Sequence, residues 1–490
     1  MSCRIFTRNI LSASGFLTRS PLSSKQIPTA VPSLILLIKP AARLRTTSPC
    51  VQRRQITMAS PNNIKLSVTD APVFSFNPKV ETAEKASELL QKDEQEHNIY
   101  FNDMGFHNHI DHHVLSIYAL GASPEDVDRA YASGSSYQRP ALPVDEDVVK
   151  RLSNKDEFRK LAGKREHYPN FLHFFKQEIE SKGVGSVVQK YLFAGGEFAD
   201  EMLARLFGGL IHPLIHLGFG IEFNQPSIIA QGLAQTATHN KQLETFFQSA
   251  EKMARDAGKP SNKTLVQLQD ELRNDSDIKR SVEWADSSKF FDGVMHRCPE
   301  KMIEYASQFN VDPSQFDEKL AELINSTVYF TGTAQNPKKA IRFDFFYIHA
   351  LNSNIFLPAF FAQSWMTKEN KVRLLEWKAR NDLLTYVSRG CTEPHLEDIT
   401  NYPAKLDWKG VFKETVALKQ DDGHAAKFIR HIAHGEKVCK PYEEKDGFRI
   451  KGDMWLKLGN MLVDSIHAPG PNWVRSAGFE EAWEEIPARQ

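Results

Sequence analysis

The chain has 490 residues, 41% of them hydrophobic, which suffices for one large domain, or for two or three smaller ones, with a substantial buried core. It contains 61 basic and 61 acidic residues, so its net charge is zero, but residues 1–69 carry ten Lys and Arg residues and no acidic residue. The rest of the chain is therefore acidic. This argues against a nucleic-acid-binding protein, because such proteins carry a basic surface.

The first 57 residues are predicted to be a leader that lies outside the fold. They are rich in Arg and Ser and lack acidic residues, which is typical of a mitochondrial transit peptide, although Met58 offers an alternative start. The apolar stretch at 30–38 contains Pro32 and is too short to span a bilayer. The five cysteines form no C-x-x-C pair, which suits a reducing compartment. We expect a cytoplasmic or mitochondrial protein without a membrane span.

Helical signals recur along the remaining chain. Residues 83–95 and 145–162 have apolar residues at helical spacing, and Ser123 and Pro124 precede acidic residues as they do at a helix start. Residues 326–331 (STVYFT) are the best strand-like run, and neither strand–helix alternation nor a fixed repeat is present. We predict an all-α fold in which residues 70–490 form a single large multi-helical domain with little or no sheet.

The densest chemical signal is a run of four histidines at positions 107, 109, 112 and 113, which leads into a helical pattern. On a helix, His109 and His113 would lie one turn apart on the same face, as two ligands of one metal ion would. His113 also falls on the apolar side of that helix. The alternative is a helix start with solvated histidines, but the density of the run favours a functional site.

Further histidines lie in apolar segments. His212 and His216 are four residues apart, Pro213 suits a first helical turn, and His239 ends the next helical segment. His349 is flanked by aromatic residues. A buried histidine needs a partner for each ring nitrogen, and a metal ion would supply one. The alternative for each of them is a core histidine that is hydrogen-bonded to the backbone.

Other motifs narrow the chemistry. The sequence contains neither a G-x-G-x-x-G nor a phosphate-binding loop, so a Rossmann site for flavin or nicotinamide is unsupported. It also contains no G-x-S-x-G of a hydrolase and no H-E-x-x-H of a zinc protease. Lys378 lies in a clear helical pattern at 374–382, and its position alone indicates a surface lysine.

Several of these segments resemble the questin oxidase-like family of fungal polyketide-tailoring enzymes. The motifs are spread over nearly the whole body of the chain and occur in one order. They are GFHNHIDHHVLSIYALGAS at 105–123, HPLIHLGFGIEF at 212–223, FYIHALNSNIFLP at 346–358, LLEWKARNDLLTYVSRG at 374–390 and DDGHAAKFIRHIAHGE at 421–436.

The resemblance implies oxidative cleavage of anthraquinones, described in some members as Baeyer–Villiger-like oxygenation. One branch of the family is understood to hold a non-haem iron by four histidines and a carboxylated lysine. Which histidine of each pair is the ligand stays open. By motif, the residues that would hold the metal are His109 or His113, His212 or His216, His349 and Lys378, with His239 as a further candidate.

We therefore predict an Fe(II)-dependent oxygenase that uses dioxygen to break a carbon–carbon bond in a small, flat aromatic polyketide such as an anthraquinone. Imidazole ligands suit iron as well as copper, nickel and zinc. One alternative is an NADPH-dependent Baeyer–Villiger-type monooxygenase. A second, from another class, is a helical binding protein without catalytic activity, which would bind no metal.

Overall fold

The computed structural model of the protein describes residues 12–13, 58–70, 73–258 and 261–489. The predicted leader, apart from Ser12 and Ala13, lies outside the described residues. Buried apolar side chains from Ile64 to Ile466 join in one hydrophobic cluster. The extent of the domain, predicted as 70–490, stays a prediction.

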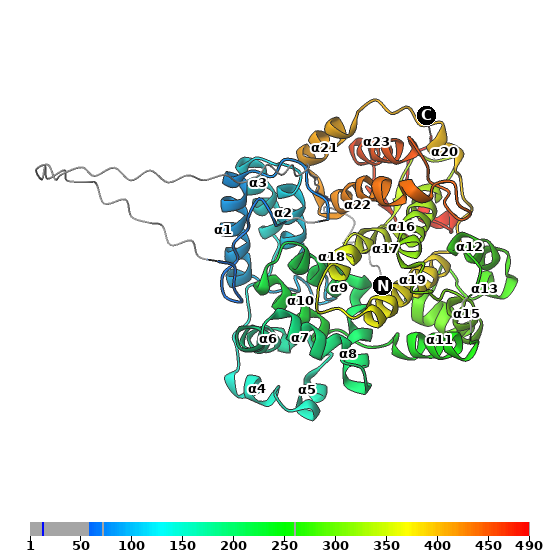
Figure 1. Ribbon diagram of the computed structural model, residues 1–490. Helices are drawn as coiled ribbons and strands as arrows, with labels where there is room; N and C mark the ends of the chain where they lie inside the picture. Colours follow the sequence, from blue (N-terminus) through cyan, green and yellow to red (C-terminus); the bar gives the residue numbers. More distant parts are fainter. Residues whose placement is uncertain (1–11, 14–57, 71–72, 259–260, 490) are drawn as a thin grey trace, which may run out of the picture.

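The described residues are mostly helical, which confirms the predicted all-α class (Figure 1). Their strands are two residues long and pair in parallel. Residues 326–331 were the best strand-like run in the sequence, and that interpretation is wrong. They lie inside helix α16 and are buried on all sides. Burial, rather than β propensity, decides the structure of this segment. The strand pairs are β1 (Ser12–Ala13) with β3 (Asp421–Asp422) and β2 (Phe343–Asp344) with β4 (Trp473–Val474).

The helices follow one another along the whole described chain. The first half contains α1 (Val80–Glu96), α2 (Ile110–Tyr118), α3 (Pro124–Ser135), α4 (Glu146–Arg151), α5 (Lys155–Leu161), η1 (Arg165–His167), α6 (Tyr168–Lys182), α7 (Val184–Val188), η2 (Gln189–Phe193), α8 (Glu197–Leu206), α9 (Gly208–Glu222) and α10 (Pro226–Thr238). The second half contains α11 (Glu244–Asp256), α12 (Leu265–Asn274), α13 (Ser276–Arg280), η3 (Lys289–Val294), α14 (Met295–Arg297), α15 (Pro299–Ser307), α16 (Phe316–Thr333), α17 (Tyr347–Asn354), α18 (Leu357–Phe361), α19 (Lys368–Ser388), α20 (Glu397–Thr400), α21 (Trp408–Ala417), α22 (His424–Cys439), η4 (Lys440–Tyr442), α23 (Met454–His467) and η5 (Glu480–Trp483).

Local capping signals explain several helix boundaries. Ser123 starts α3 with a reciprocal capping box to Asp126, as its sequence predicts. The helical pattern at 145–162 is divided into α4 and α5, because Asp145 and Asn154 each cap a separate helix with their side-chain oxygens.

Four helices from distant parts of the chain form the centre of the molecule (Figure 1). Helix α2 packs against α9 and α22, and α17 packs against the same two helices, so the four close into a ring. The remaining helices surround this group, with α4–α8 and α11 at the lower side of the view and α20, α21 and α23 at the upper side. The ring brings together residues that are more than 300 positions apart.

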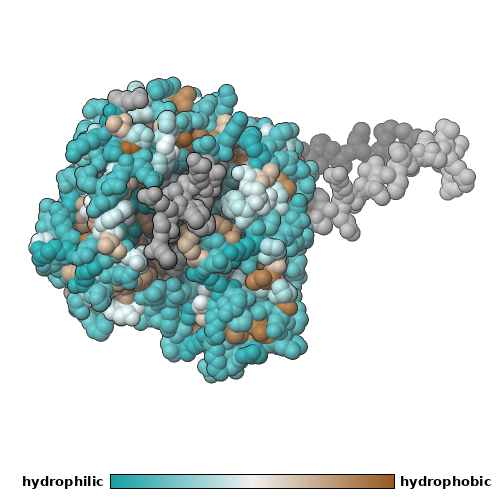
Figure 2. Space-filling view, turned by 180° about the vertical axis from the view of Figure 1, so that it is seen from behind, coloured by the Kyte–Doolittle hydropathy of each residue, from teal (hydrophilic) through white to brown (hydrophobic). Residues whose placement is uncertain are grey.

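The surface seen from behind is mainly hydrophilic, and hydrophobic residues appear there in small separate groups (Figure 2). Within the described residues, no single helix is long and apolar enough to cross a membrane. Only the pair α8 and α9, bent by 93° at their junction, reaches the required length and apolarity together.

Candidate metal centre and adjoining cavity

The four central helices begin at one place, and each contributes a histidine near its N-terminus. His109 is the N-cap of α2, and His424 is the first residue of α22. His349 is the third residue of α17, and His212 lies at the start of the regular part of α9. Four helix N-termini therefore face one buried site, and their dipoles add partial positive charge there.

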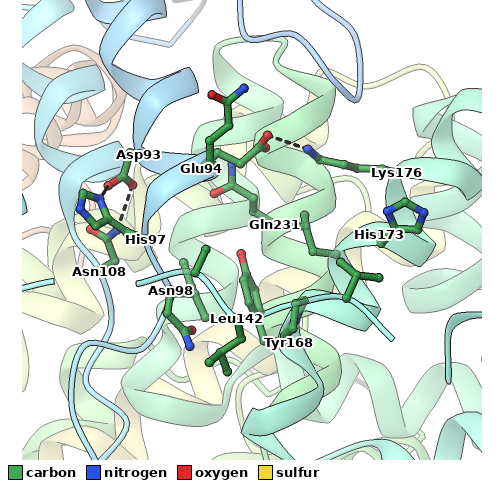
Figure 3. Close-up of a pocket in the computed structure, with 16 residues that line it drawn as sticks. Asp93, Glu94, His97, Asn98, Asn108, Leu142, Tyr168, His173, Lys176 and Gln231 are labelled. Carbon is green, nitrogen blue, oxygen red and sulfur yellow. Dashed lines mark hydrogen bonds and ion pairs between the residues drawn. The ribbon is translucent and has the colours of Figure 1, made fainter. Parts of the chain in front are cut away.

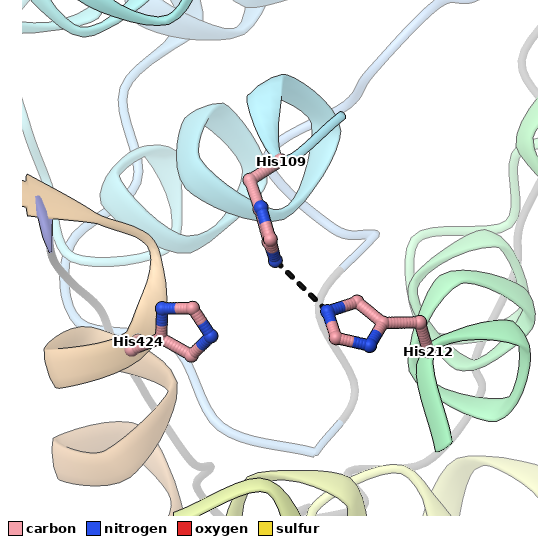
Figure 4. Close-up of side chains that lie close together, drawn as sticks. All are labelled: His109, His212 and His424. Carbon is pink, nitrogen blue, oxygen red and sulfur yellow. Dashed lines mark hydrogen bonds between the residues drawn. The ribbon is translucent and has the colours of Figure 1, made fainter. Parts of the chain in front are cut away.

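The imidazole rings of these residues point toward one another. One nitrogen each of His109, His212 and His424 lies within 4.8 Å of the other two, which suits a metal ion (Figure 4). The Nε2 atoms of His109 and His212 are 3.0 Å apart, as are the Nε2 atoms of His349 and His424. We call these four residues the histidine group.

Acceptors on the outer side of three rings fix which nitrogen carries the proton. The Nδ1–H groups of His212 and His349 donate to the carbonyls of Gly209 and Phe345, at 2.7 and 2.6 Å. The Nδ1 of His424 is hydrogen-bonded to the carboxylate of Asp422. In a neutral imidazole, a protonated Nδ1 leaves Nε2 with a lone pair. The Nε2 atoms that face the centre are therefore prepared to bind a cation.

The surroundings keep these rings neutral. All four are buried, and burial is the main cause that lowers the pKa of His109, His212 and His349 well below the ordinary value. Burial also lowers the pKa of His424, although Asp422 opposes the shift. The neutral imidazole is the form that binds metal ions.

A left-handed turn places His212. Gly209, Leu210 and Ile211 have φ values of 52°, 56° and 61°, a region that residues with a side chain rarely adopt. A Cβ atom at Gly209 would lie 2.1 Å from Nε2 of His239, so a side chain at that position would displace the His239 ring. Such strain persists where the surrounding structure enforces it, often at functional sites.

A lysine that sequence reasoning did not single out lies beside the histidine group. Lys427 is completely buried on α22, three residues after His424 and thus on the same helix face. Its Nζ is 3.3 Å from Nδ1 of His112. Burial lowers the pKa of Lys427 to about 8, against the opposing effect of Asp422.

Of the residues predicted from the sequence, the structure brings His109, His212 and His349 together. His113 is buried next to the backbone of Gly423, and burial lowers its pKa to about 3. No described contact joins its ring to the histidine group. His216 is also turned away, because its Nε2 faces Gln231 at 3.0 Å and Asp111 at 3.2 Å.

His239 belongs to a neighbouring pair. Its Nδ1–H donates to the carbonyl of Gln235 at 2.7 Å, so its Nε2 accepts a hydrogen bond from Nε2–H of His107 at 2.9 Å. The His107 ring stacks on His212 with centroids 4.1 Å apart. The pair thus lies against the histidine group without facing its centre.

The sequence position of Lys378 indicated a surface lysine, but the structure shows that it is not at the surface. It is completely buried, and its ammonium group is paired with the carboxylate of Asp382 and donates to the carbonyl of Ala350 at 3.1 Å. No described contact joins Lys378 to the histidine group. The pattern misled because α19 is surrounded by other helices, so even its polar positions are buried.

His424 was present in the quoted motifs but was not named as a ligand. Its ring faces His349, which lies 75 positions earlier, across the α17–α22 contact. No spacing within one helix can indicate such a pair. The available signal was the sequence Asp422–His424, since a carboxylate close to a histidine often orients a metal-binding ring.

A cavity of about 440 Å³ opens onto the histidine group and is large enough for a multi-ring ligand. His109, His212 and His424 form part of its wall. Aromatic side chains make up much of the remainder, and the cations of two arginines also line it. We call it the substrate cavity; its other lining residues include Phe101, Phe106, Phe345, Phe346, Trp473, Arg165 and Arg475.

A separate hollow of about 230 Å³ lies around Asp93 and Lys176 (Figure 3). Its charged groups are paired with one another, as Lys176 is with Glu94 at 2.6 Å. Asp93 accepts a hydrogen bond from the Asn108 side chain at 2.9 Å, and Asn108 in turn accepts one from the backbone N–H of Ile110. This hollow therefore helps to hold the segment that carries His109.

Fold and site together define an all-helical protein with a histidine-rich centre beside an aromatic-lined cavity. The family model described as questin oxidase-like matches residues 106–432, and the chain belongs to that family. It is 43% identical to the Baeyer–Villiger oxidase ptaJ of Pestalotiopsis fici, over 84% of this chain and 95% of the relative.

Two further relatives support the same class. The chain is 41% identical to a questin oxidase of Aspergillus fumigatus, over 83% of this chain and 94% of the relative. It is 39% identical to the Baeyer–Villiger monooxygenase dmxR6 of a Cryptosporiopsis species, over 81% of this chain and 92% of the relative. The protein is an oxidoreductase.

Proposed function

We propose that the protein is a metal-dependent oxygenase, with Fe(II) as the metal, that uses dioxygen to cleave a carbon–carbon bond in a flat aromatic polyketide such as an anthraquinone. The observation that carries this proposal is the meeting of Nε2 lone pairs at the histidine group. The Nδ1–H groups of His349 and His424 are both engaged outward, so their Nε2 atoms face each other without a proton at 3.0 Å. A cation between them removes that repulsion.

The spacing fits one metal ion. One nitrogen each of His109, His212 and His424 lies within 4.8 Å of the other two, close enough for all three to hold the same ion. Imidazole ligands suit iron, and dioxygen chemistry favours iron over zinc, which has no redox activity. When bound, the metal would supply the redox-active centre that activates dioxygen.

Lys427 would complete the ligand set. The family resemblance implies four histidines and a carboxylated lysine, and the residues that fit are the histidine group and Lys427 in place of Lys378. Because burial lowers the pKa of Lys427 to about 8, a fraction of the protein molecules carry this side chain as a neutral amine, which can add carbon dioxide. The resulting carbamate is an anion, which the four converging helix N-termini would stabilise.

The chain's own residues would bind and orient the substrate. Phe345, Phe346 and Trp473 offer aromatic faces against which a flat ring system can stack. The guanidinium of Arg475 lies 4.1 Å from the Phe345 ring centre and gives the cavity a positive charge that suits a phenolate. His107 and His239 line the same cavity and share a proton between their Nε2 atoms, which could move toward or from a substrate hydroxyl.

The names of the relatives support the substrate class. They include questin oxidases and Baeyer–Villiger oxidases, and the latter name describes insertion of oxygen beside a carbonyl. The relative named a Baeyer–Villiger monooxygenase favours a second candidate, an NADPH-dependent monooxygenase.

A dioxygenase places both oxygen atoms in the product. A monooxygenase places one there and reduces the other to water with two electrons from a donor such as NADPH.

One experiment tests both candidates. The protein is loaded anaerobically with Fe(II) and incubated with questin under ¹⁸O₂, with and without NADPH, and the product is analysed by mass spectrometry. We expect turnover that depends on iron and two labelled oxygen atoms in the product without NADPH. One labelled atom together with stoichiometric NADPH consumption would establish the second candidate. Full turnover after chelation of all metal would contradict the requirement for a metal and therefore the proposed function.

A further inference from the structure

A second cavity adjoins the substrate cavity and also reaches the histidine group. It has a volume of about 190 Å³ and reaches from half-buried Phe290 and Phe291 in η3 to the buried ring of His349. We call it the side cavity. Gly209, Leu210 and Phe346 line both cavities and therefore form the wall between them.

The two cavities meet different members of the histidine group. The substrate cavity is lined by His109, His212 and His424, whereas the side cavity is lined by His349 alone of the four. The candidate metal centre is thus accessible from two directions.

The lining of the side cavity is apolar. Phe207, Leu243 and Ala350 line its inner part, where each of them is buried. Its buried polar groups have partners within the chain, as the Thr385 hydroxyl does by donating to the carbonyl of Asn381 at 2.8 Å. The amide of Asn240 is exposed and lies at the outer end. The cavity therefore offers an apolar interior with few polar groups left to bind a polar ligand.

Its size favours a small ligand over the aromatic substrate. Pockets for drug-sized ligands have volumes of about 300–1,000 Å³, and the side cavity lies below that range. Apolar cavities of such dimensions take up small apolar molecules and gases such as xenon. Dioxygen is small and apolar, and it is the second substrate of the proposed reaction.

We propose that the side cavity is a binding and entry site for dioxygen, which reaches the candidate metal centre past His349 while the aromatic substrate occupies the other cavity. This inference rests on the proposed function for the identity of the gas. Its physical part, an apolar gas site beside His349, does not depend on turnover. It predicts that the aromatic substrate can bind first without blocking dioxygen.

Xenon is the probe for the physical part. Crystals of the protein are pressurised with xenon, and its anomalous signal is located. We expect a xenon atom between Phe207, Leu243 and Ala350, and its loss in Ala204→Phe, which places a ring in the cavity that Ala204 lines. A side cavity that stays empty of xenon in the wild-type crystal would overturn the inference, whatever the activity of the protein.

Steady-state kinetics with questin and varied dioxygen test the route. Ala204→Phe, and Leu243→Trp in case the first variant does not fold, should raise the KM for dioxygen about tenfold while the KM for questin changes little. Met104→Trp, which narrows the substrate cavity instead, should do the reverse. An unchanged KM for dioxygen in a folded variant that no longer binds xenon would overturn the route. If xenon binds but no variant or wild-type protein turns over questin, the proposed function fails and the gas site stands.

Discussion

Two buried lysines in this protein have opposite surroundings, and this difference separates their roles. The ammonium group of Lys378 is paired with Asp382 and thus has a compensating charge. The Nζ of Lys427 faces Nδ1 of His112 at 3.3 Å, and burial lowers its pKa to about 8 against the opposing charges of Asp422 and Asp421. Burial favours the neutral amine, which is the form that can become a carbamate.

Substitution of the two lysines should therefore have different effects. We expect Lys427→Met to fold with the wild-type helical circular dichroism spectrum but to lose most of its metal and activity. Lys378→Met should instead keep its metal and lower the stability by about 3–5 kcal/mol, because it leaves Asp382 as an unpaired buried charge. The measurements are the metal content of the folded protein and its thermal midpoint.

The double variant Lys378→Met/Asp382→Asn is the control, since removal of both charges should restore much of the stability. A ¹³C nuclear magnetic resonance signal of a carbamate after incubation with labelled bicarbonate should be present in the wild type and absent from Lys427→Met. Full metal content in Lys427→Met would show that the histidine group binds the metal without a lysine.

At the level of residues, the sequence indicated three of the four members of the histidine group. His109 and His113 were a plausible pair because residues four apart share a helix face. His109, however, is the N-cap of α2, with φ −105° and ψ 5°, and lies outside the helix. Its ring therefore does not share a helix face with His113. His424 and Lys427 could not be found by spacing, because their partners come from other helices.

At the level of elements, the crossing of α9 and α10 depends on glycines. A Cβ atom at Gly232 would lie 2.6 Å from both Cα and N of Leu217, and a Cβ atom at Gly220 would lie 2.6 Å from N of Ile229. The two helices thus approach each other at backbone distance. Since α9 carries His212, this contact fixes the position of one member of the histidine group relative to the rest of the fold.

We expect Gly232→Ala to lower the free energy of unfolding by about 1–3 kcal/mol, because the added methyl group meets rigid backbone and must push α9 and α10 apart. Denaturant unfolding followed by circular dichroism measures this change. Thr245→Ala on the exposed side of α11 is the control and should stay within about 0.5 kcal/mol of the wild type. Equal stabilities of Gly232→Ala and the wild type would refute the close contact.

Helix boundaries with a local cause could be predicted from the sequence, as at Ser123, whose capping box starts α3. The segment at 326–331 could not. Its β-branched and aromatic residues favour a strand locally, but α16 is buried along its whole C-terminal half, and tertiary packing outweighs the local preference. The left-handed turn at 209–211 also has no local signal except its glycine.

At the level of the whole molecule, the histidine group exists only when the complete fold is formed. Its members come from positions 109, 212, 349 and 424, and the ring of α2, α9, α17 and α22 brings them together. An all-helical class was predictable from periodicity, but this ring depends on contacts between distant helices. A metal that binds only the folded chain would stabilise the entire protein by mass action.

The most direct test of this account is the metal content of the purified full chain after loading with Fe(II), measured by inductively coupled plasma mass spectrometry for the wild type, His424→Ala and His216→Gln. We predict about one iron per chain in the wild type, loss of most of the iron in His424→Ala, and retention of the iron in His216→Gln, because His216 faces Gln231 and Asp111 rather than the histidine group. A wild-type protein that binds no metal, or a folded His424→Ala that binds it as tightly as the wild type, would contradict the account.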